Sequence, residues 1–289
     1  MNQNSKELLL YLAGIAVAFA GLYYLLLTAG KESATADKTS HSDNVIRSHT
    51  IHDAAGTGSV PVADEIIIPW ENLFDACDLS GWAVIERPAK VSVRDSSIVL
   101  NMTAFTSRHA FVRTEEKYSD FIFEVEYRRD SAMESGILFR SEDAPDTAFT
   151  ALLGYMVKID SSPAQLWTGG VVLDYGNGLN WLHSLEGDDR ARHAEKAGGE
   201  WNHLRIEAIG EEIKVWVNGI PTAHLADDKF REGYIAFIIH YLKKDETLEL
   251  LEIAYRNPRV ITVEPEKYSR PMDLSVRDTK GKLEVTYFR

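Results

Sequence analysis

The segment FIFEVEYR, residues 121–128, alternates strictly between two kinds of side chain. Phe121, Phe123, Val125 and Tyr127 fall on one face of an extended chain, and the mostly charged residues between them fall on the other. A period of two with one apolar face is the pattern of a half-buried antiparallel strand. The segment therefore predicts a sheet with one face in a core and one face turned away from it.

Further short runs rich in strand-forming residues continue along the chain, with turn residues between them. They are SIVLNM (97–102), AFVRT (110–114), GILFRS (136–141), GYMVKID (154–160), WNHLRIEAIG (201–210), EIKVWVNG (212–219), YIAFIIH (234–240) and LELLEIAYR (248–256). Asn218-Gly219 is a strong signal for a tight hairpin. Because no long amphipathic helix or glycine-rich phosphate loop intervenes, we predict an all-β protein, an antiparallel sandwich or barrel.

Composition excludes several classes of function. The 289 residues leave room for one sizeable domain with appendages or for two small domains. The net charge is −13 and no lysine- or arginine-rich patch stands out, which argues against a nucleic-acid partner. The single cysteine, Cys77, excludes an internal disulfide and a cysteine-cluster metal site.

The segment from Leu8 to Ala29, LLLYLAGIAVAFAGLYYLLLTA, contains no charged residue. As a helix it would be about 33 Å long, enough to cross a hydrocarbon layer of about 30 Å. A signal peptide has a shorter apolar region, and a buried core helix would carry a polar stripe. We therefore expect a single-pass membrane anchor that contacts the lipid bilayer through residues 8–29. Its small residues, including Gly14, Ala18 and Gly21, would let other membrane helices pack closely.

The composition changes after the anchor to serine, threonine, aspartate and glycine, without periodicity, which indicates a flexible linker over residues 30–63. The linker histidines lack acidic or thiol companions, so we interpret them as solvated. A short N-terminal tail ahead of a large domain favours a domain outside the cytoplasm, in the periplasm.

Several segments resemble, in serial order, motifs of the DUF1080 or 3-keto-disaccharide hydrolase-like family. They are LFDACDLSGWAV (73–84), YSDFIFEVEYR (118–128), ESGILFR (134–140), GYMVKID (154–160), TGG (168–170), GEWNHLRI (199–206), VWVNGI (215–220) and EGYIAFIIH (232–240). The resemblance covers residues 66–260. It implies a concanavalin-like jelly-roll domain over residues 64–262, with two antiparallel sheets, one of them concave, and sugars handled on the concave side in relatives that act on them.

The residues expected at the family's site are largely replaced. The glutamate and glutamine of the family's Gly-Tyr-Glu-Val-Gln strand fall on Met156 and Lys158, and the asparagine before Ser-Gly-Ile falls on Glu134. A thioether cannot serve as a general acid or base. Other carboxylates, at Glu134, Glu124 or Asp160, remain as replacements.

The late family motif is altered in the same way. Its glutamine and aspartate fall on Ile238 and Ile239, which leaves His240. Together with Arg140 and Glu134, His240 is a candidate catalytic residue, although Arg140 could be structural and paired with an acid such as Glu142. The replacements predict a groove that has lost its family chemistry.

Candidate binding residues lie on and after the GYMVKID segment. They are Met156, Lys158, Asp160, Trp167 and Trp181. The tryptophans could stack on sugar rings or pack against a sheet. A nearby group of His183, Asp188, Asp189, His193 and Glu195 could hold a metal, but its spacing matches no known loop, so we interpret it as a solvated charged loop. No metal and no cofactor are expected.

The C-terminal extension, residues 263–289, contains MDLSV (272–276) and KLEVTYF (282–288) around a Lys280-Gly281 turn. This pattern predicts a β-hairpin. Because an isolated hairpin is marginally stable, it should pack either on its own sandwich or on another protein.

Two functional hypotheses follow. The first is a membrane-anchored, non-catalytic binding or structural accessory subunit of a larger membrane complex, for example a respiratory or photosynthetic one. The second is a membrane-tethered glycoside hydrolase or lectin that acts on (3-keto-)disaccharides outside the cytoplasm. The anchor and the altered site favour the first, and the family resemblance and the many aromatic residues favour the second.

Overall fold

A computed structural model describes residues 67–85, 89–102, 109–144, 151–174, 179–196, 198–240 and 251–279. All of them belong to the second of two compact units, Gly56–Arg289. The expected anchor and linker lie outside the described residues. None of the helices that are described has the length and apolar character needed to cross a membrane.

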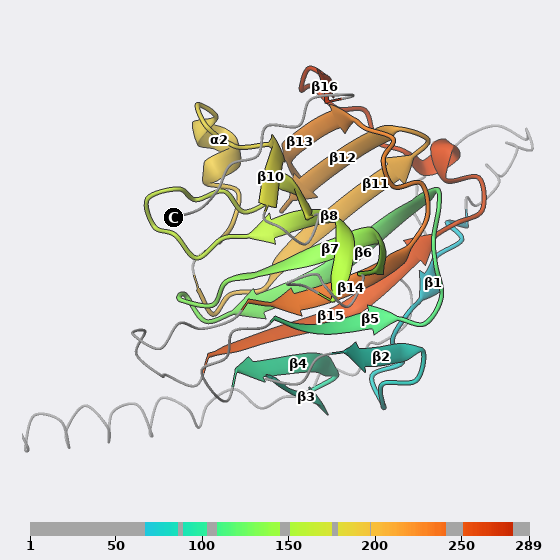
Figure 1. The fold of residues 1–289 in the computed structure, drawn as a ribbon, viewed down its shortest axis with the longest axis vertical. Helices are drawn as coiled ribbons and strands as arrows, with labels where there is room; N and C mark the ends of the chain where they lie inside the picture. Colours follow the sequence, from blue (N-terminus) through green and yellow to red (C-terminus); the bar gives the residue numbers. More distant parts are fainter. Residues whose placement is uncertain are drawn as a thin grey trace, which may run out of the picture. The chain divides into compact units, whose positions relative to one another are not determined.

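The described residues form two sheets (Figure 1). The larger is a nine-stranded sheet with the order β16 (Arg277–Asp278), β13 (Ile220–Ala226), β12 (Glu212–Val217), β11 (Asn202–Ile209), β6 (Phe121–Arg129), β15 (Glu252–Ile261), β4 (Ser97–Met102) and β3 (Ala89–Arg94), with β1 (Glu71–Asn72) also on β15.

The smaller is a seven-stranded sheet with the order β10 (Leu179–His183), β9 (Val171–Asp174), β8 (Leu152–Ile159), β7 (Ser135–Asp143), β14 (Tyr234–Ile239), β5 (Ala110–Thr114) and β2 (Trp82–Ile85). The helical elements described are α2 (Asp189–Arg192) and the 3-10 turn η1 (Pro265–Tyr268). Among described strands, every pairing is antiparallel except that of β13 with β16. The expectation of an all-β antiparallel sandwich is confirmed.

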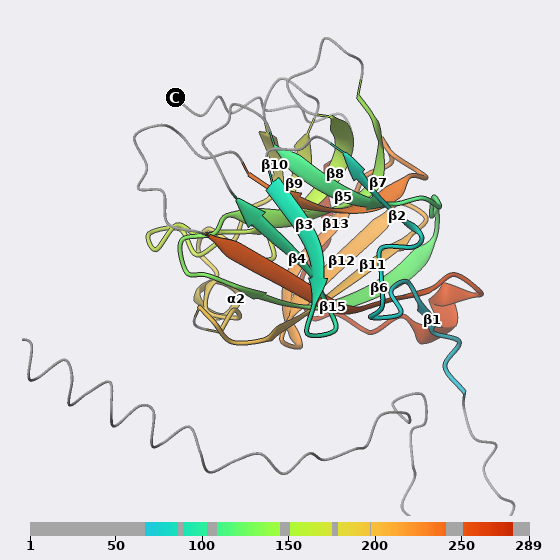
Figure 2. The same cartoon turned by 90° about the horizontal axis from the view of Figure 1, so that it is seen from below.

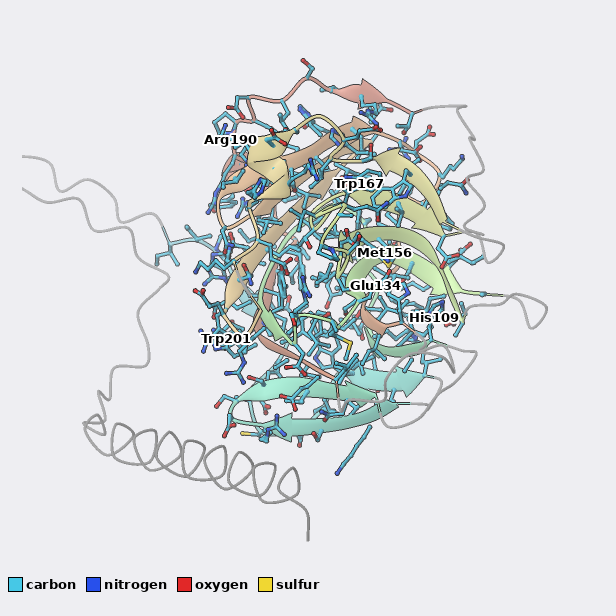
Figure 3. The ribbon with its side chains drawn as sticks, turned by 90° about the vertical axis from the view of Figure 1, so that its left-hand side faces the viewer. His109, Glu134, Met156, Trp167, Arg190 and Trp201 are labelled. Atoms are coloured by element: carbon cyan, nitrogen blue, oxygen red, sulfur yellow. The ribbon has the colours of Figure 1, made fainter. Side chains whose placement is uncertain are left out.

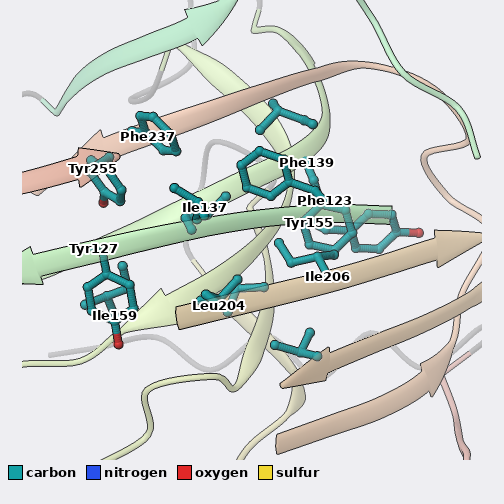
Figure 4. Packing of buried hydrophobic residues seen from close by; sticks show 14 of the residues in the cluster. Phe123, Tyr127, Ile137, Phe139, Tyr155, Ile159, Leu204, Ile206, Phe237 and Tyr255 are labelled. Carbon is teal, nitrogen blue, oxygen red and sulfur yellow. The ribbon is translucent and has the colours of Figure 1, made fainter. Parts of the chain in front are cut away.

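The core lies between the two sheets, which form separate layers in Figure 2. The apolar face of β6, from Phe121 to Tyr127, is fully buried in it. Aromatic rings join the layers: Phe237 on β14 stacks on Tyr255 of β15 with centroids 3.9 Å apart (Figure 4). The alternation that predicts β6 therefore also identifies its core face.

Residues 268–279, which we call the C-terminal strap, cross the other face of the nine-stranded sheet. Arg205 donates to the Tyr268 carbonyl at 2.8 Å, and Ser269 donates to Glu207 at 2.6 Å. The strap ends in β16, which pairs with β13. Residues 272–276, the first strand of the expected hairpin, form no strand, and the second strand lies outside the described residues. The described part of the extension thus packs on its own sandwich.

Candidate functional site

The seven-stranded sheet has a second buried face, turned away from the core, which we call the outer face. Its apolar side chains form a cluster separate from the core, here called the apolar strip: Phe111, Leu138, Leu152, Met156, Val172, Ala236 and Ile238. Met156 lies opposite Leu138 on β7 and Val172 on β9. Met156 and Ile238 are each 1% exposed. Met156 and Ile238, which replace polar groups of the family, therefore lie on the outer face, as expected, but they are buried there, whereas Ile239 lies in the core between the sheets.

Four polar side chains meet at one end of this strip, and we call them the polar cluster: His109, Glu134, Lys158 and His240. Residues two apart on a strand share a face, so each stands beside a residue of the strip or beside Gly136. Lys158 is opposite Gly136, which is opposite Ile238. Figure 3 shows Trp167, Met156, Glu134 and His109 one after another, from top to bottom, along this sheet.

Lys158 is the centre of the polar cluster. Its ammonium forms an ion pair with Glu134 and lies 3.5 Å from Nε2 of His240. The His240 ring meets the His109 ring edge-on, with centroids 4.8 Å apart. The Lys158 side chain is 7% exposed and that of Glu134 is 42% exposed. Glu134 is therefore the part of the pair that solvent or a ligand reaches first.

The burial of these groups shifts their protonation. Burial lowers the pKa of Lys158 to about 8, although the Asp160 carboxylate acts in the opposite direction. Burial, together with the charge of Lys158, lowers the pKa of His109 to about 4 and holds that of His240 well below its usual value. Both imidazoles are neutral at pH 7, so Nε2 of His240 accepts a hydrogen bond from the Lys158 ammonium. The cluster combines an amine near its pKa, a carboxylate and two neutral imidazoles.

The glycine at position 136 makes room for Met156. A Cβ at Gly136 would lie 2.7 Å from Sδ of Met156 and 3.0 Å from the Val157 carbonyl oxygen. The Met156 side chain thus lies against the bare backbone of β7, beside Lys158.

Replacing Gly136 with alanine is expected to lower the free energy of unfolding by about 1–3 kcal/mol, because the methyl group overpacks this contact. Denaturant unfolding of the full chain measures the loss. Adding Met156→Ala should recover part of it, giving an interaction energy of about 1 kcal/mol. Simple additivity of the two substitutions would contradict this packing.

Arg140 does not belong to the polar cluster. It is completely buried and donates to the carbonyls of Ser119 and Gly210, at 2.7 and 2.8 Å. Its carboxylate partner is Asp120 at 3.0 Å, rather than Glu142 as suggested by the sequence. These contacts fasten the ends of β6 and β11 to β7, so Arg140 is structural.

Asp160 closes a loop and does not face a ligand. Its carboxylate accepts hydrogen bonds from the backbone N–H groups of Ser162 and Trp167, at 3.1 and 3.0 Å. The loop places Trp167 edge-on against Trp181, with centroids 4.8 Å apart. Trp181 packs on the apolar strip, and its buried Nε1 has no hydrogen-bond partner among the residues that the structure describes. The tryptophan pair therefore lies on the outer face, where the Trp181 ring lies against Gly170, the residue whose backbone pairs with that of Lys158.

The histidine and acidic residues between His183 and Glu195, which the sequence analysis considered as metal ligands, do not come together as a metal site in the described part of the chain. Glu195 forms an ion pair with Arg129 at 2.8 Å and accepts hydrogen bonds from Tyr127 and Thr168. This carboxylate is only 12% exposed and anchors the loop, which the interpretation as a solvated loop missed. Within the described part of the chain, no group of three or more histidine, cysteine or acidic residues could hold a metal.

His109 is the member of the polar cluster that the sequence analysis missed. The available signal was its position two residues before Phe111, which places it on the same face of the strand that begins at Ala110. Nothing in the sequence showed that this strand would lie beside the one that ends in front of His240.

The chain belongs to the family described as the 3-keto-alpha-glucoside-1,2-lyase-like domain, whose model matches residues 69–261. This confirms the resemblance to the 3-keto-disaccharide hydrolase-like family. A comparison with curated proteins finds no significant match.

Several solved structures are similar to this chain. A putative glycosyl hydrolase from Parabacteroides distasonis is 14% identical, with 68% of this chain and 94% of that chain covered and a TM-score of 0.48. The carbohydrate-binding module CBM66 from Bacillus subtilis is 14% identical, with 62% and 93% covered and a TM-score of 0.46. A putative beta-glucanase from Mycobacterium abscessus is 10% identical, with 66% and 98% covered and a TM-score of 0.45.

Proposed function

We propose that this protein acts on 3-keto-glucosides at the polar cluster, by removing the proton next to the ketone and releasing the substituent at C1. The observation that carries the proposal is the ion pair of Lys158 with Glu134, beside a neutral His240, at the end of a dry apolar face. Membership of a family described by 1,2-lyase chemistry supplies the substrate class.

Elimination across C1 and C2 of a 3-keto-glucoside makes three chemical demands. The ketone oxygen must be polarised, the C2 proton needs a base, and the departing oxygen at C1 needs an acid. Lys158 is placed to act on the ketone, and Glu134 can accept one proton and later return it. Neutral His240 supplies a second acceptor or donor within reach of Lys158. The cluster therefore provides the required groups without the family's glutamate.

The apolar strip supports this chemistry by keeping Lys158 dry. Met156 and Ile238 lie beside Lys158 and its neighbour Gly136. The same burial weakens the hypothesis of an accessory subunit, because the strip is already covered within the chain and offers little apolar surface to a partner protein. We retain the membrane anchor at residues 8–29 and a domain outside the cytoplasm as proposals. With this topology the site would meet its substrates outside the cytoplasm.

The direct test is incubation of the full chain with methyl 3-keto-α-glucoside. We expect methanol and a 1,2-unsaturated 3-ketosugar to form, whereas a hydrolase would yield methanol and 3-ketoglucose. Nuclear magnetic resonance spectroscopy distinguishes the two sets of products. Methanol release no faster than in buffer alone would contradict the proposed function.

The rate should depend on pH through Lys158. Because burial lowers the pKa of Lys158 to about 8, the ammonium that polarises the ketone is lost as the pH rises toward and past that value. His109, with a pKa of about 4, and His240 stay neutral throughout this range. We expect kcat/KM to be level below about pH 7 and to fall above it with an apparent pKa near 8. A profile that is flat between about pH 6 and 9 would contradict a role for the Lys158 amine.

A further inference from the structure

Lys158 differs from the other buried lysine of the described residues in how its charge is compensated. The ammonium of Lys214 lies 3.1 Å from Glu212 and 4.0 Å from Glu207 and donates to Ser269 at 3.2 Å. Among the described residues, Lys158 is in contact with one carboxylate, that of Glu134, and with a neutral imidazole, while the Asp160 carboxylate also acts on its charge. Lys214 thus has two carboxylates and a hydroxyl in reach of its Nζ, whereas Nζ of Lys158 has a single carboxylate in contact.

The surroundings of Lys158 favour a neutral, nucleophilic amine. Met156 precedes it on the same face of β8, and Ile238 stands across Gly136 on the neighbouring strands. Desolvation disfavours the ammonium, and a carboxylate in contact can take the proton that the amine loses. A desolvated lysine beside a proton acceptor is the arrangement that forms Schiff bases with carbonyl substrates.

We propose that Lys158 bonds covalently to the substrate, its Nζ forming an iminium with the C3 carbon of a 3-keto-glucoside. This inference rests on the proposed function and adds the way in which the ketone is activated. An iminium carries a full positive charge next to C2, so it acidifies the C2 proton more strongly than a hydrogen bond to the ketone oxygen.

The first half of the reaction forms the iminium. The Lys158 ammonium passes a proton to Glu134, and the nitrogen lone pair forms the bond to C3. The nitrogen then gives a proton to the former ketone oxygen, which leaves as water after taking the proton from Glu134. One ammonium and one ketone thus become one iminium and one water, with Glu134 again a carboxylate.

The second half releases the substituent. Glu134 takes the C2 proton, and the C–H electron pair forms an enamine. The enamine electrons form the C1–C2 double bond, the C1–O bond breaks, and Glu134 returns its proton to the departing oxygen. Water then adds to C3 of the iminium and frees Lys158 as an ammonium. The net products are an alcohol and a 1,2-unsaturated 3-ketosugar, and no oxidant or reductant is consumed.

The test is reductive trapping of the full chain with methyl 3-keto-α-glucoside and sodium cyanoborohydride, followed by peptide mass mapping. We expect one sugar-derived adduct on the peptide with Lys158, about tenfold more abundant than on any other lysine peptide. In Lys158→Arg this adduct should be lost, whereas Lys90→Arg, which alters an exposed lysine of β3, should keep it.

The outcomes separate the covalent step from the function beneath it. Methanol release by the wild-type chain without a preferred adduct on Lys158 would overturn the iminium and leave the proposed function intact. An adduct spread evenly over the surface lysines would have the same meaning. If the wild-type chain neither releases methanol nor traps sugar, both proposals fall. Because the mapping is made on the wild-type chain, the result does not depend on how well a variant folds.

Discussion

Replacing Lys158 with glutamine is expected to lower kcat/KM for methyl 3-keto-α-glucoside by about 10²–10⁴-fold, the range that a positioned acid–base group contributes. Glutamine is the residue that the family resemblance places at this position, so the side chain fits a strand of this kind. Its amide can neither lose a proton to Glu134 nor bond to a carbonyl carbon. The substitution thus removes the chemistry and preserves the length and polarity of the side chain.

The control for this prediction is Lys90→Gln, which changes an exposed lysine of β3 on the other sheet and should leave kcat/KM unchanged. Steady-state kinetics on both variants, with thermal unfolding to verify that each is folded, make the comparison. If a folded Lys158→Gln variant retains kcat/KM within about threefold of wild type, the amine is not part of the chemistry.

Replacing Glu124 with alanine is expected to lower the free energy of unfolding by about 3–5 kcal/mol, because the change leaves the buried positive charge of Arg205 without one of its carboxylate partners. The Glu124 side chain is 4% exposed and accepts from Arg205 at 2.7 Å and from Arg259 at 2.8 Å. His203 lies 3.5 Å away. Arg205, itself 3% exposed, would keep Glu207 but lose its second carboxylate.

The matched control is Glu126→Ala on the same strand. Glu126 is 29% exposed and pairs with Arg256 at 2.8 Å, so its loss should cost about 1 kcal/mol or less. Denaturant unfolding of the full chain measures both variants. Equal losses in the free energy of unfolding for the two variants would contradict a larger contribution from the buried Glu124 network.

The difference between these variants should also depend on pH. Burial alone would raise the pKa of Glu124, but hydrogen bonds from His203, Arg259 and Arg205 hold it well below its usual range. A lowered pKa means that the folded state binds the proton more weakly than the unfolded state does. The stabilisation by Glu124 is therefore complete at neutral pH and decreases as the pH falls below the unfolded pKa toward the folded one.

The sequence predicted β4, β5, β6, β7, β8, β11, β12, β14 and β15, because alternation is a local property, but it missed strands such as β2, β3, β9, β10 and β13. The pattern of FIFEVEYR correctly assigns Phe121 and Tyr127 to the core and Glu124 to the opposite face. It could not show that Glu124 would be buried, because part of what lies over that face is the C-terminal strap, far away in the sequence. The predicted partner of Arg140, Glu142, was wrong for the same reason, because Asp120 comes next to Arg140 only when the two sheets pack together.

The candidate site was predictable only in part. The sequence analysis singled out Lys158 as a candidate binding residue and Glu134 and His240 as candidate catalytic residues, and the structure brings these three together. The inference of lost chemistry, however, followed from the apolar replacements at Met156, Ile238 and Ile239. Whether a lysine in a strand is solvated or desolvated depends on its neighbours across the sheet, which the sequence does not order. The desolvation of Lys158, and the presence of His109 near it, required the fold.

The most direct test of the central claim, that the polar cluster removes a proton next to a ketone, is exchange in heavy water. Methyl 3-keto-α-glucoside is incubated with the full chain in D₂O, and the C2 proton signal is followed by nuclear magnetic resonance. We predict that the signal disappears faster with the wild-type chain than in buffer, and that Lys158→Gln removes the difference. Exchange at the buffer rate with the wild-type chain, or at the same rate with both proteins, would contradict the claim.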